Sequence, residues 1–342
     1  MPCDSCADVT GSLAFLRAGQ RQLGGRDLST ITATDLEAAL AGDPEALDVH
    51  LTLIERDVAV AGQSVRIHCH CLAIDGNGRV QLRRLAEFMR NAAADYAISR
   101  PKLAQAKARD AKFNSNDAVA ALVEEAKRSF TDLATTGEGG ELLLYLLAQR
   151  FLKLPQILCK MDLKSDPQVH YHGADGVYAG VTPEGTLKLY WGESKVYAKA
   201  ADAITACLKS LAPYLVEEEH EDAERERDLI LLSDKADLND EELTAALRKY
   251  FDRSSPMSNR VRYCGVALVG FGVPFYPDEG ADGVADEIAA AVKEALSDWV
   301  EKVGASIVSN KLESLEIEFL CVPLPSAQGF RDVFLKVMGL TT

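Results

Sequence analysis

Three carboxylates and one lysine are spaced along this sequence so that they could act together on a phosphodiester. Glu141 opens one apolar stretch, Asp175 begins a second, and Glu193 and Lys195 lie two residues apart in a third. Residues i and i+2 of a strand point to the same face, so Glu193 and Lys195 are expected to project together. A hairpin made by the second and third stretches would bring Asp175 beside them.

These residue types suit hydrolysis assisted by a hard cation. Mg²⁺ takes oxygen ligands, retains several of its waters and can activate one of them as a nucleophile. Asp175 and Glu193 would hold Mg²⁺, with Mn²⁺ as an alternative, and the backbone carbonyl of Ser194 could add a ligand. The Lys195 ammonium would then orient the attacking water. Glu141 would bind the metal through water or hold a second ion.

The same pattern has a simpler interpretation, because an acidic residue followed by Glu-x-Lys also occurs by chance. Glu193 and Lys195 could form an ordinary salt bridge on an exposed strand. The context favours a site, since the charges interrupt an apolar pattern. The apolar neighbours are Val177, Tyr178, Leu189, Tyr190, Trp191 and Val196.

The segments around these residues are predicted to form a helix, a hairpin and a second helix. A strongly apolar helix is expected over 141–154, following the break at 137–140. Strands at 176–181 and 186–197 enclose the turn Thr-Pro-Glu-Gly. Apolar residues then recur at helical spacing over 198–214.

The rest of the chain alternates helical and extended patterns. Short helices are expected at 34–41 and 45–48, and a strand at 64–74. Asn239 and Glu242 resemble a capping box for a helix over 240–252. The remaining predictions are helices at 79–98, 101–111, 115–134, 217–232, 281–303 and 327–338, and strands at 262–272 and 315–322.

This order of elements predicts an α/β protein with two regions. Residues 1–134 would form an N-terminal α/β and helical extension. Residues 135–342 would form a core with a mixed sheet flanked by helices, an acidic helical insertion at about 216–253, and a C-terminal α/β elaboration.

Composition limits the classes of protein that fit. The chain has 342 residues, 47% hydrophobic and 26% charged, which is sufficient for a sizeable core. No apolar run is long enough to span a membrane, and the first residues lack a signal-peptide pattern, so a cytoplasmic location is expected. The eight thinly scattered cysteines indicate free thiols rather than a disulfide framework.

The net charge of −15 argues against a protein whose whole surface grips nucleic acid. Much of the excess lies in 217–228, where eight acidic residues accompany two arginines. This segment is expected to be a solvated helix face. A regulatory docking surface, or a segment that repels DNA from the isolated subunit, is the alternative.

Histidines and cysteines offer further candidates. Cys3 and Cys6 form a C-x-x-C, but His68 and His70 would share one strand face while Cys69 and Cys71 share the other, which disfavours zinc. His170 and His172 precede Asp175 and could contact the phosphate or the waters of the metal. The simpler expectation is that both are satisfied residues at a strand end.

Around the carboxylates and the lysine described first, the chain resembles HamA, the nuclease subunit of the Hachiman antiphage defence system. The resemblance covers about 65–340 and rests on HCHCLAID, GEGGELLLYLLAQRF, HGADGVY and WGESKVY. It implies a PD-(D/E)xK, restriction-endonuclease-like core, dependence on Mg²⁺ and DNA as substrate. It also implies a superfamily 2 helicase partner, HamB, that engages DNA and holds the nuclease in check.

The resemblance carries roles to individual positions. Asp175, Glu193 and Lys195 match the motif, and Glu141 matches its helix glutamate, with Glu138 as a competitor. Ala174 stands where the motif name has proline. The chain has no P-loop, so an ATP-driven step would come from the partner.

Two other functions remain open at this point. The chain could be a nuclease-like binding module that restrains or recruits a helicase. It could also be a metal-dependent phosphodiesterase acting on RNA or nucleotides, because the motif reads the phosphate and not the sugar.

Overall fold

The computed structural model describes residues 30–131, 137–159, 173–216, 224–238, 240–278 and 281–340. The strands of these residues form one seven-stranded sheet in the order β1-β2-β7-β6-β5-β4-β3. Their bounds are β1 (Leu51–Ala59), β2 (Val65–Leu72), β3 (Gln156–Leu158), β4 (Gly176–Val181), β5 (Leu187–Tyr197), β6 (Val261–Gly272) and β7 (Ile317–Leu324). The four strands β2, β7, β6 and β5 run parallel, whereas β1 and β4 are antiparallel to their neighbours. The expected mixed α/β architecture is therefore confirmed.

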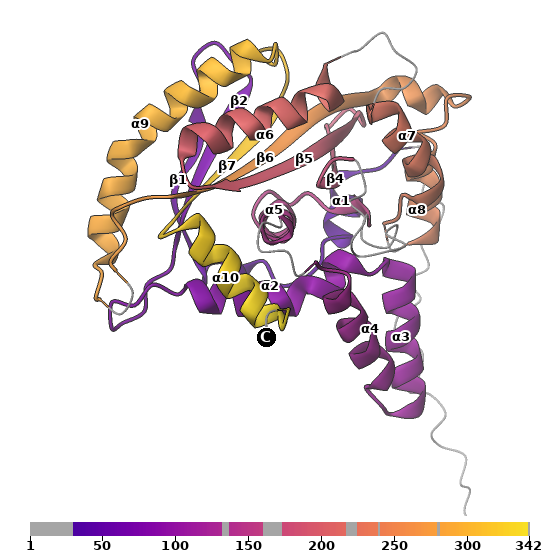
Figure 1. The fold of residues 1–342 in the computed structure, drawn as a ribbon. Coiled ribbons are helices and arrows are strands. Elements are labelled where there is room, and N and C mark those ends of the chain that lie inside the picture. The colour runs from indigo at the N-terminus through magenta and orange to yellow at the C-terminus, as the bar shows by residue number, and fades with distance from the viewer. Residues whose placement is uncertain are drawn as a thin grey trace, which may run out of the picture.

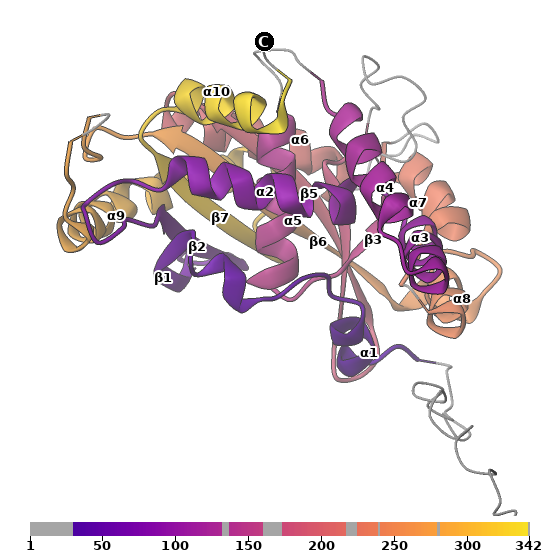
Figure 2. The ribbon, with the colours of Figure 1, turned by 90° about the horizontal axis from the view of Figure 1, so that it is seen from below.

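Helices cover both faces of this sheet (Figure 1). The bounds are α1 (Ala33–Ala38), α2 (Leu82–Ala97), α3 (Arg100–Phe113), α4 (Asp117–Arg128), α5 (Glu138–Arg150), α6 (Ala200–Leu215), α7 (Glu224–Lys235), α8 (Glu241–Arg248), α9 (Ala285–Ser309) and α10 (Ala327–Met338). Short 3-10 helices span Glu45–Leu47 and Pro256–Arg260. Helices α5, α2 and α10 lie on one face and α6 and α9 on the other, as Figures 1 and 2 show.

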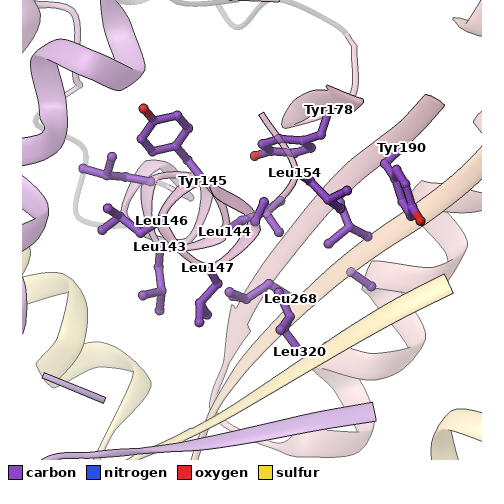
Figure 3. Packing of buried hydrophobic residues seen from close by; sticks show 14 of the residues in the cluster. Leu143, Leu144, Tyr145, Leu146, Leu147, Leu154, Tyr178, Tyr190, Leu268 and Leu320 are labelled. Atoms are coloured by element: carbon purple, nitrogen blue, oxygen red, sulfur yellow. The ribbon is translucent and has the colours of Figure 1, made fainter. Parts of the chain in front are cut away.

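Helix α5 forms the centre of the core. All residues from Leu142 to Ala148 are buried, so the helix is apolar all round, as expected for an interior helix. Its leucines lie against side chains of β6 and β7, including Leu268 and Leu320 (Figure 3). Gly140 lets this helix approach β5 closely, because a Cβ there would lie 3.1 Å from Val196 Cγ2 and 3.3 Å from Ser194 Oγ.

The hairpin predicted from the sequence is confirmed: β4 begins and ends as expected, and β5 starts one residue later. Strand β1 was not predicted. It is an edge strand with several exposed side chains and two register shifts, so apolar and polar residues do not alternate regularly. The three-residue strand β3 is too short to leave a pattern.

The cap of α8 differs from the predicted one. Asp240 is the N-cap residue, and its carboxylate accepts a hydrogen bond from the Leu243 N–H at 2.9 Å. Asn239, the predicted cap, lies outside the described residues. The acidic helix predicted over 217–232 is described from Glu224, where α7 begins, and residues 217–223 also lie outside the described part.

One sheet runs through both regions predicted from the sequence. Strands β1 and β2 come from the N-terminal region, and β2 pairs with β7, some 250 residues later in the chain. The predicted division near residue 134 stays a prediction.

Candidate active site

The hairpin register places Asp175 opposite the Glu-Ser-Lys sequence of β5. The last paired residues are Gly176 and Gly192, and the Asp175 N–H then donates to the Gly192 carbonyl at 2.7 Å. The Asp175 carboxylate turns back onto β5: its Oδ2 accepts hydrogen bonds from the N–H and the hydroxyl of Ser194, both at 2.8 Å. Two donors on one oxygen hold this half-buried carboxylate in a defined orientation.

Glu193 and Lys195 project to one face, as the i and i+2 spacing predicts. Lys195 Nζ lies 3.0 Å from Glu193 Oε2. The Glu193 side chain is 6% exposed and the Lys195 side chain is 23% exposed, so this is not a pair on an exposed strand. Trp191, two residues earlier on the same face, stacks on Tyr214 of α6, so the pair projects from the α6 side of the sheet.

Helix α6 also anchors the backbone at this point. The Cys207 thiol donates to the carbonyl of Glu193 at 3.3 Å. Burial raises the pKa of Cys207, and the nearby Glu193 carboxylate adds to the increase, so the sulfur remains a neutral donor. Cys207 is therefore a structural contact of the site.

The electrostatic surroundings keep Lys195 charged. Burial acts to lower the pKa of Lys195, but the carboxylates of Asp175 and Glu193 outweigh it and hold the pKa well above its usual value. Both carboxylates therefore act on one ammonium. Lys195 can donate hydrogen bonds and stabilise negative charge at neutral pH, but it cannot accept a proton.

Glu141 reaches the site from the opposite face of the sheet. Its Oε2 accepts a hydrogen bond from the hydroxyl of Tyr96, which is buried at the end of α2, at 3.1 Å. Burial and the Glu141 carboxylate raise the pKa of Tyr96 well above its usual value, so Tyr96 stays a donor. Glu138, the competing candidate, is buried and accepts from the Thr131 N–H at 2.6 Å, which joins the start of α5 to the end of the preceding helical hairpin.

Tyr178 lies near both Asp175 and Glu141. A Cβ on Gly176 would lie 2.4 Å from its hydroxyl, and a Cβ on Gly192 would lie 2.9 Å from its ring, so these glycines make room for the ring. Its pKa is raised well above the usual value by burial, and also by Tyr145, Asp175 and Glu141. The buried hydroxyl has no hydrogen-bond partner among the described residues. It is thus a donor beside the carboxylates.

The donor set fits a metal that keeps most of its water. Mg²⁺ is usually bound through one or two carboxylates, with waters completing its octahedron. Asp175 and Glu193 provide such hard oxygen ligands, and the unpartnered Tyr178 hydroxyl could donate to a bound water. Among the described residues no three His, Cys, Asp or Glu side chains are close enough to form a metal cage. Ligation by Glu141 and by the Ser194 carbonyl stays a prediction.

The other sequence candidates take structural positions or lie outside the described residues. His68 Nε2 lies 2.8 Å from Glu318 Oε2, and burial lowers the pKa of His70 to about 3. Cys69 and Cys71 are buried free thiols. Cys3, Cys6, His170 and His172 lie outside the described residues, as do residues 217–223 of the acidic segment.

Sequence reasoning missed two tyrosines at the site. Tyr178 was noted only as an apolar neighbour, although its position two residues after a glycine at the strand start was a usable signal. Tyr96 lies 45 residues before Glu141, and no local pattern connects the two.

A comparison with protein families finds that the HamA family model matches residues 48–338. The chain belongs to the HamA family. This membership assigns it to Hachiman antiphage defence and implies partners within that system. A comparison with curated proteins finds no match. Within the described part of the chain, no helix has both the length and the apolar character needed to cross a bilayer.

Proposed function

We propose that this chain is a Mg²⁺-dependent deoxyribonuclease of the PD-(D/E)xK type and the effector of its defence complex. The observation that carries the proposal is the half-buried Lys195 ammonium beside the carboxylates of Asp175 and Glu193. The order of elements supports it: helix α5, the β4–β5 hairpin, helix α6, and then β6 parallel to β5. Family membership supports the role in a defence complex.

The chemistry follows from the charges of the site. Asp175 and Glu193 would hold the metal, which when bound neutralises phosphate charge and lowers the pKa of a coordinated water. Lys195 donates a hydrogen bond to the attacking water and orients it in line with the scissile bond. Because Lys195 stays protonated, the proton of that water leaves to solvent or to the phosphate and not to the lysine. Ser194 keeps the Asp175 carboxylate in place.

The partner in this proposal is a superfamily 2 helicase of the HamB type. The chain has a net charge of −15 and no P-loop, so ATP-driven engagement of DNA would be supplied by the other subunit. The helicase would restrain the nuclease until it encounters its signal. An interaction with DNA and helicase together agrees with the family assignment.

The test is plasmid cleavage with Mg²⁺, by this chain alone and with the helicase subunit. Lys195→Ala is compared with Lys188→Ala, because both lysines lie on β5, are similarly exposed, and pair with a glutamate at 3.0 and 2.7 Å. Lys195→Ala should abolish cleavage while Lys188→Ala retains it. Cleavage that is equal in both variants would refute the site.

The same experiment separates the competing functions. If neither preparation cleaves DNA in a Lys195-dependent manner but Lys195-dependent RNA or nucleotide hydrolysis is found, the phosphodiesterase alternative holds. If no substrate is cleaved and the chain still binds the helicase, it is a binding module.

A further inference from the structure

One segment of this acidic chain is rich in basic residues. Residues 79–113 contain nine Lys or Arg and three Asp or Glu, a net charge of +6 within a chain of −15. The segment corresponds to α2, α3 and the residues that lead into them. We call this stretch the basic band (residues 79–113).

Helix α3 carries three accessible cations of the basic band. Lys107, Arg109 and Lys112 are exposed and form no ion pair with any described residue, whereas Lys102 at the base pairs with Glu125 of α4. Asp110, the one acid of α3, is buried and accepts hydrogen bonds from two N–H groups at the start of α4. Its charge is therefore directed into the α3–α4 contact, whereas the three cations lie on the solvent-exposed part of α3.

The α3–α4 hairpin projects from the body of the protein (Figure 1). Helix α3 has 14 residues, so it is about 21 Å long. Between the cations its outer surface carries small residues, Ala104, Ala108 and Ala111, which are exposed. A partner could thus approach the helix closely while the long cationic side chains reach around it.

The basic band passes the candidate active site at the junction of its two helices. Tyr96, at the end of α2, donates its hydroxyl to Glu141, and α3 starts four residues later at Arg100. A long polyanion bound along α3 would therefore run toward the carboxylates of the site. This arrangement offsets the repulsion that those carboxylates exert on phosphate.

We propose that the exposed cations of α3 bind the phosphate backbone of duplex DNA and lead it to the active site. The charges are complementary, because uncompensated Lys and Arg on one projecting helix are what a polyphosphate requires. Phosphate contacts position a duplex without reading its sequence. The choice of DNA rests on the proposed nuclease function.

The test measures binding separately from cleavage. The full chain is titrated into a short fluorescein-labelled DNA duplex in EDTA, and anisotropy is followed at several salt concentrations. The test variant is the triple substitution Lys107→Gln, Arg109→Gln and Lys112→Gln. Each lost phosphate contact lowers the slope of log Kd against log salt by about 0.9, so the slope should fall by up to about 3 and Kd should rise about tenfold or more at low salt.

A matched control removes the same charge elsewhere. Lys209, Lys249 and Lys311 are exposed and form no ion pair with any described residue, and they lie on α6 and after α8 and α9. Their triple change to glutamine should shift Kd less than about threefold. Circular dichroism melting of both variants verifies that each is folded.

Three results would overturn the proposal: equal shifts in the two triple variants, no binding of duplex DNA by the parent chain, or unchanged DNA affinity with lost binding to the helicase subunit or to RNA. The last would make the α3 surface a contact for that other partner. A chain that binds DNA through α3 but does not cleave it would refute the nuclease and leave this surface intact.

Discussion

Two clusters of charged side chains on the same sheet differ in how their charge is balanced. In the candidate site, Glu193 pairs with Lys195, while Asp175 is bonded by the neutral Ser194 and Glu141 by a neutral tyrosine. Three carboxylates and one ammonium are thus gathered among the described residues of the site. Their oxygens are the hard ligands that a cation such as Mg²⁺ takes.

The second cluster joins β2, β5 and β7. Lys188 Nζ lies 2.7 Å from Glu316 Oε1, and Glu318 pairs with Arg66 and lies 2.8 Å from His68 Nε2. Here two carboxylates meet two permanent cations and a histidine. Burial of ionisable groups alone therefore does not mark a site: the ion pairs of the second cluster tie strands together, whereas the first cluster gathers oxygen ligands that suit a cation.

The largest difference is expected when a carboxylate of each cluster is neutralised. Glu193→Gln should lower the initial rate of DNA cleavage at least about 100-fold, since a metal ligand is lost. Glu318→Gln should leave that rate within a few-fold of the parent but lower the free energy of unfolding by about 1 kcal/mol, because the half-exposed Arg66 keeps only its longer contacts with Glu316 and Asp57. Cleavage assays and urea unfolding measure both quantities. The reverse pattern would contradict the comparison.

A smaller effect is expected from two tyrosines that donate to glutamates. Tyr96→Phe removes the hydrogen bond to Glu141, and Tyr190→Phe removes the bond to Glu316. Each should lower the free energy of unfolding by about 1 kcal/mol. Only Tyr96→Phe should also reduce cleavage, by about tenfold. If both variants cleave equally, Tyr96 has no role in positioning Glu141 for the reaction.

Metal binding should distinguish the clusters without any substrate. A ligand that binds the folded state at about five times its Kd adds about 1 kcal/mol to the free energy of unfolding. Mg²⁺ should stabilise the parent and Glu316→Gln by this amount and should not stabilise Glu193→Gln. Differential scanning fluorimetry with and without Mg²⁺ measures it. Stabilisation that survives in Glu193→Gln would place the metal elsewhere.

The smallest expected effect is on the free energy of unfolding at acid pH. Burial acts to raise the pKa of Glu316, but Lys188, Tyr190 and Arg66 outweigh it, and the pKa lies below the ordinary value of 4.5. A lowered carboxyl pKa contributes stability that is present above pH 4.5 and is lost as pH falls through the folded-state pKa. The loss of stability between pH 7 and acid should therefore be smaller in Glu316→Gln than in the parent. Urea unfolding at both pH values measures this loss, and an equal loss in the parent and in Glu316→Gln would contradict the prediction.

Local patterns explain why much of the site was predictable. The hairpin follows from two apolar stretches around a Pro-Glu-Gly turn, and a period of two residues places Glu193 and Lys195 on one face. Helix α5 follows from its continuous apolar sequence. These features depend on neighbours within a few residues, so one sequence is sufficient to predict them.

The features of the site that could not be predicted depend on residues far apart in the sequence. The sequence by itself determined which residues could hold a cation and that Lys195 lies beside Glu193. Only the tertiary structure decided that Lys188, on the same strand, serves a balanced cluster, because its partner Glu316 lies 128 residues away and comes close only through the sheet. It likewise brought Tyr96 to Glu141 and directed the cations of α3 outward. Sheet order and helix placement arise from burial of the whole core, which no local pattern encodes.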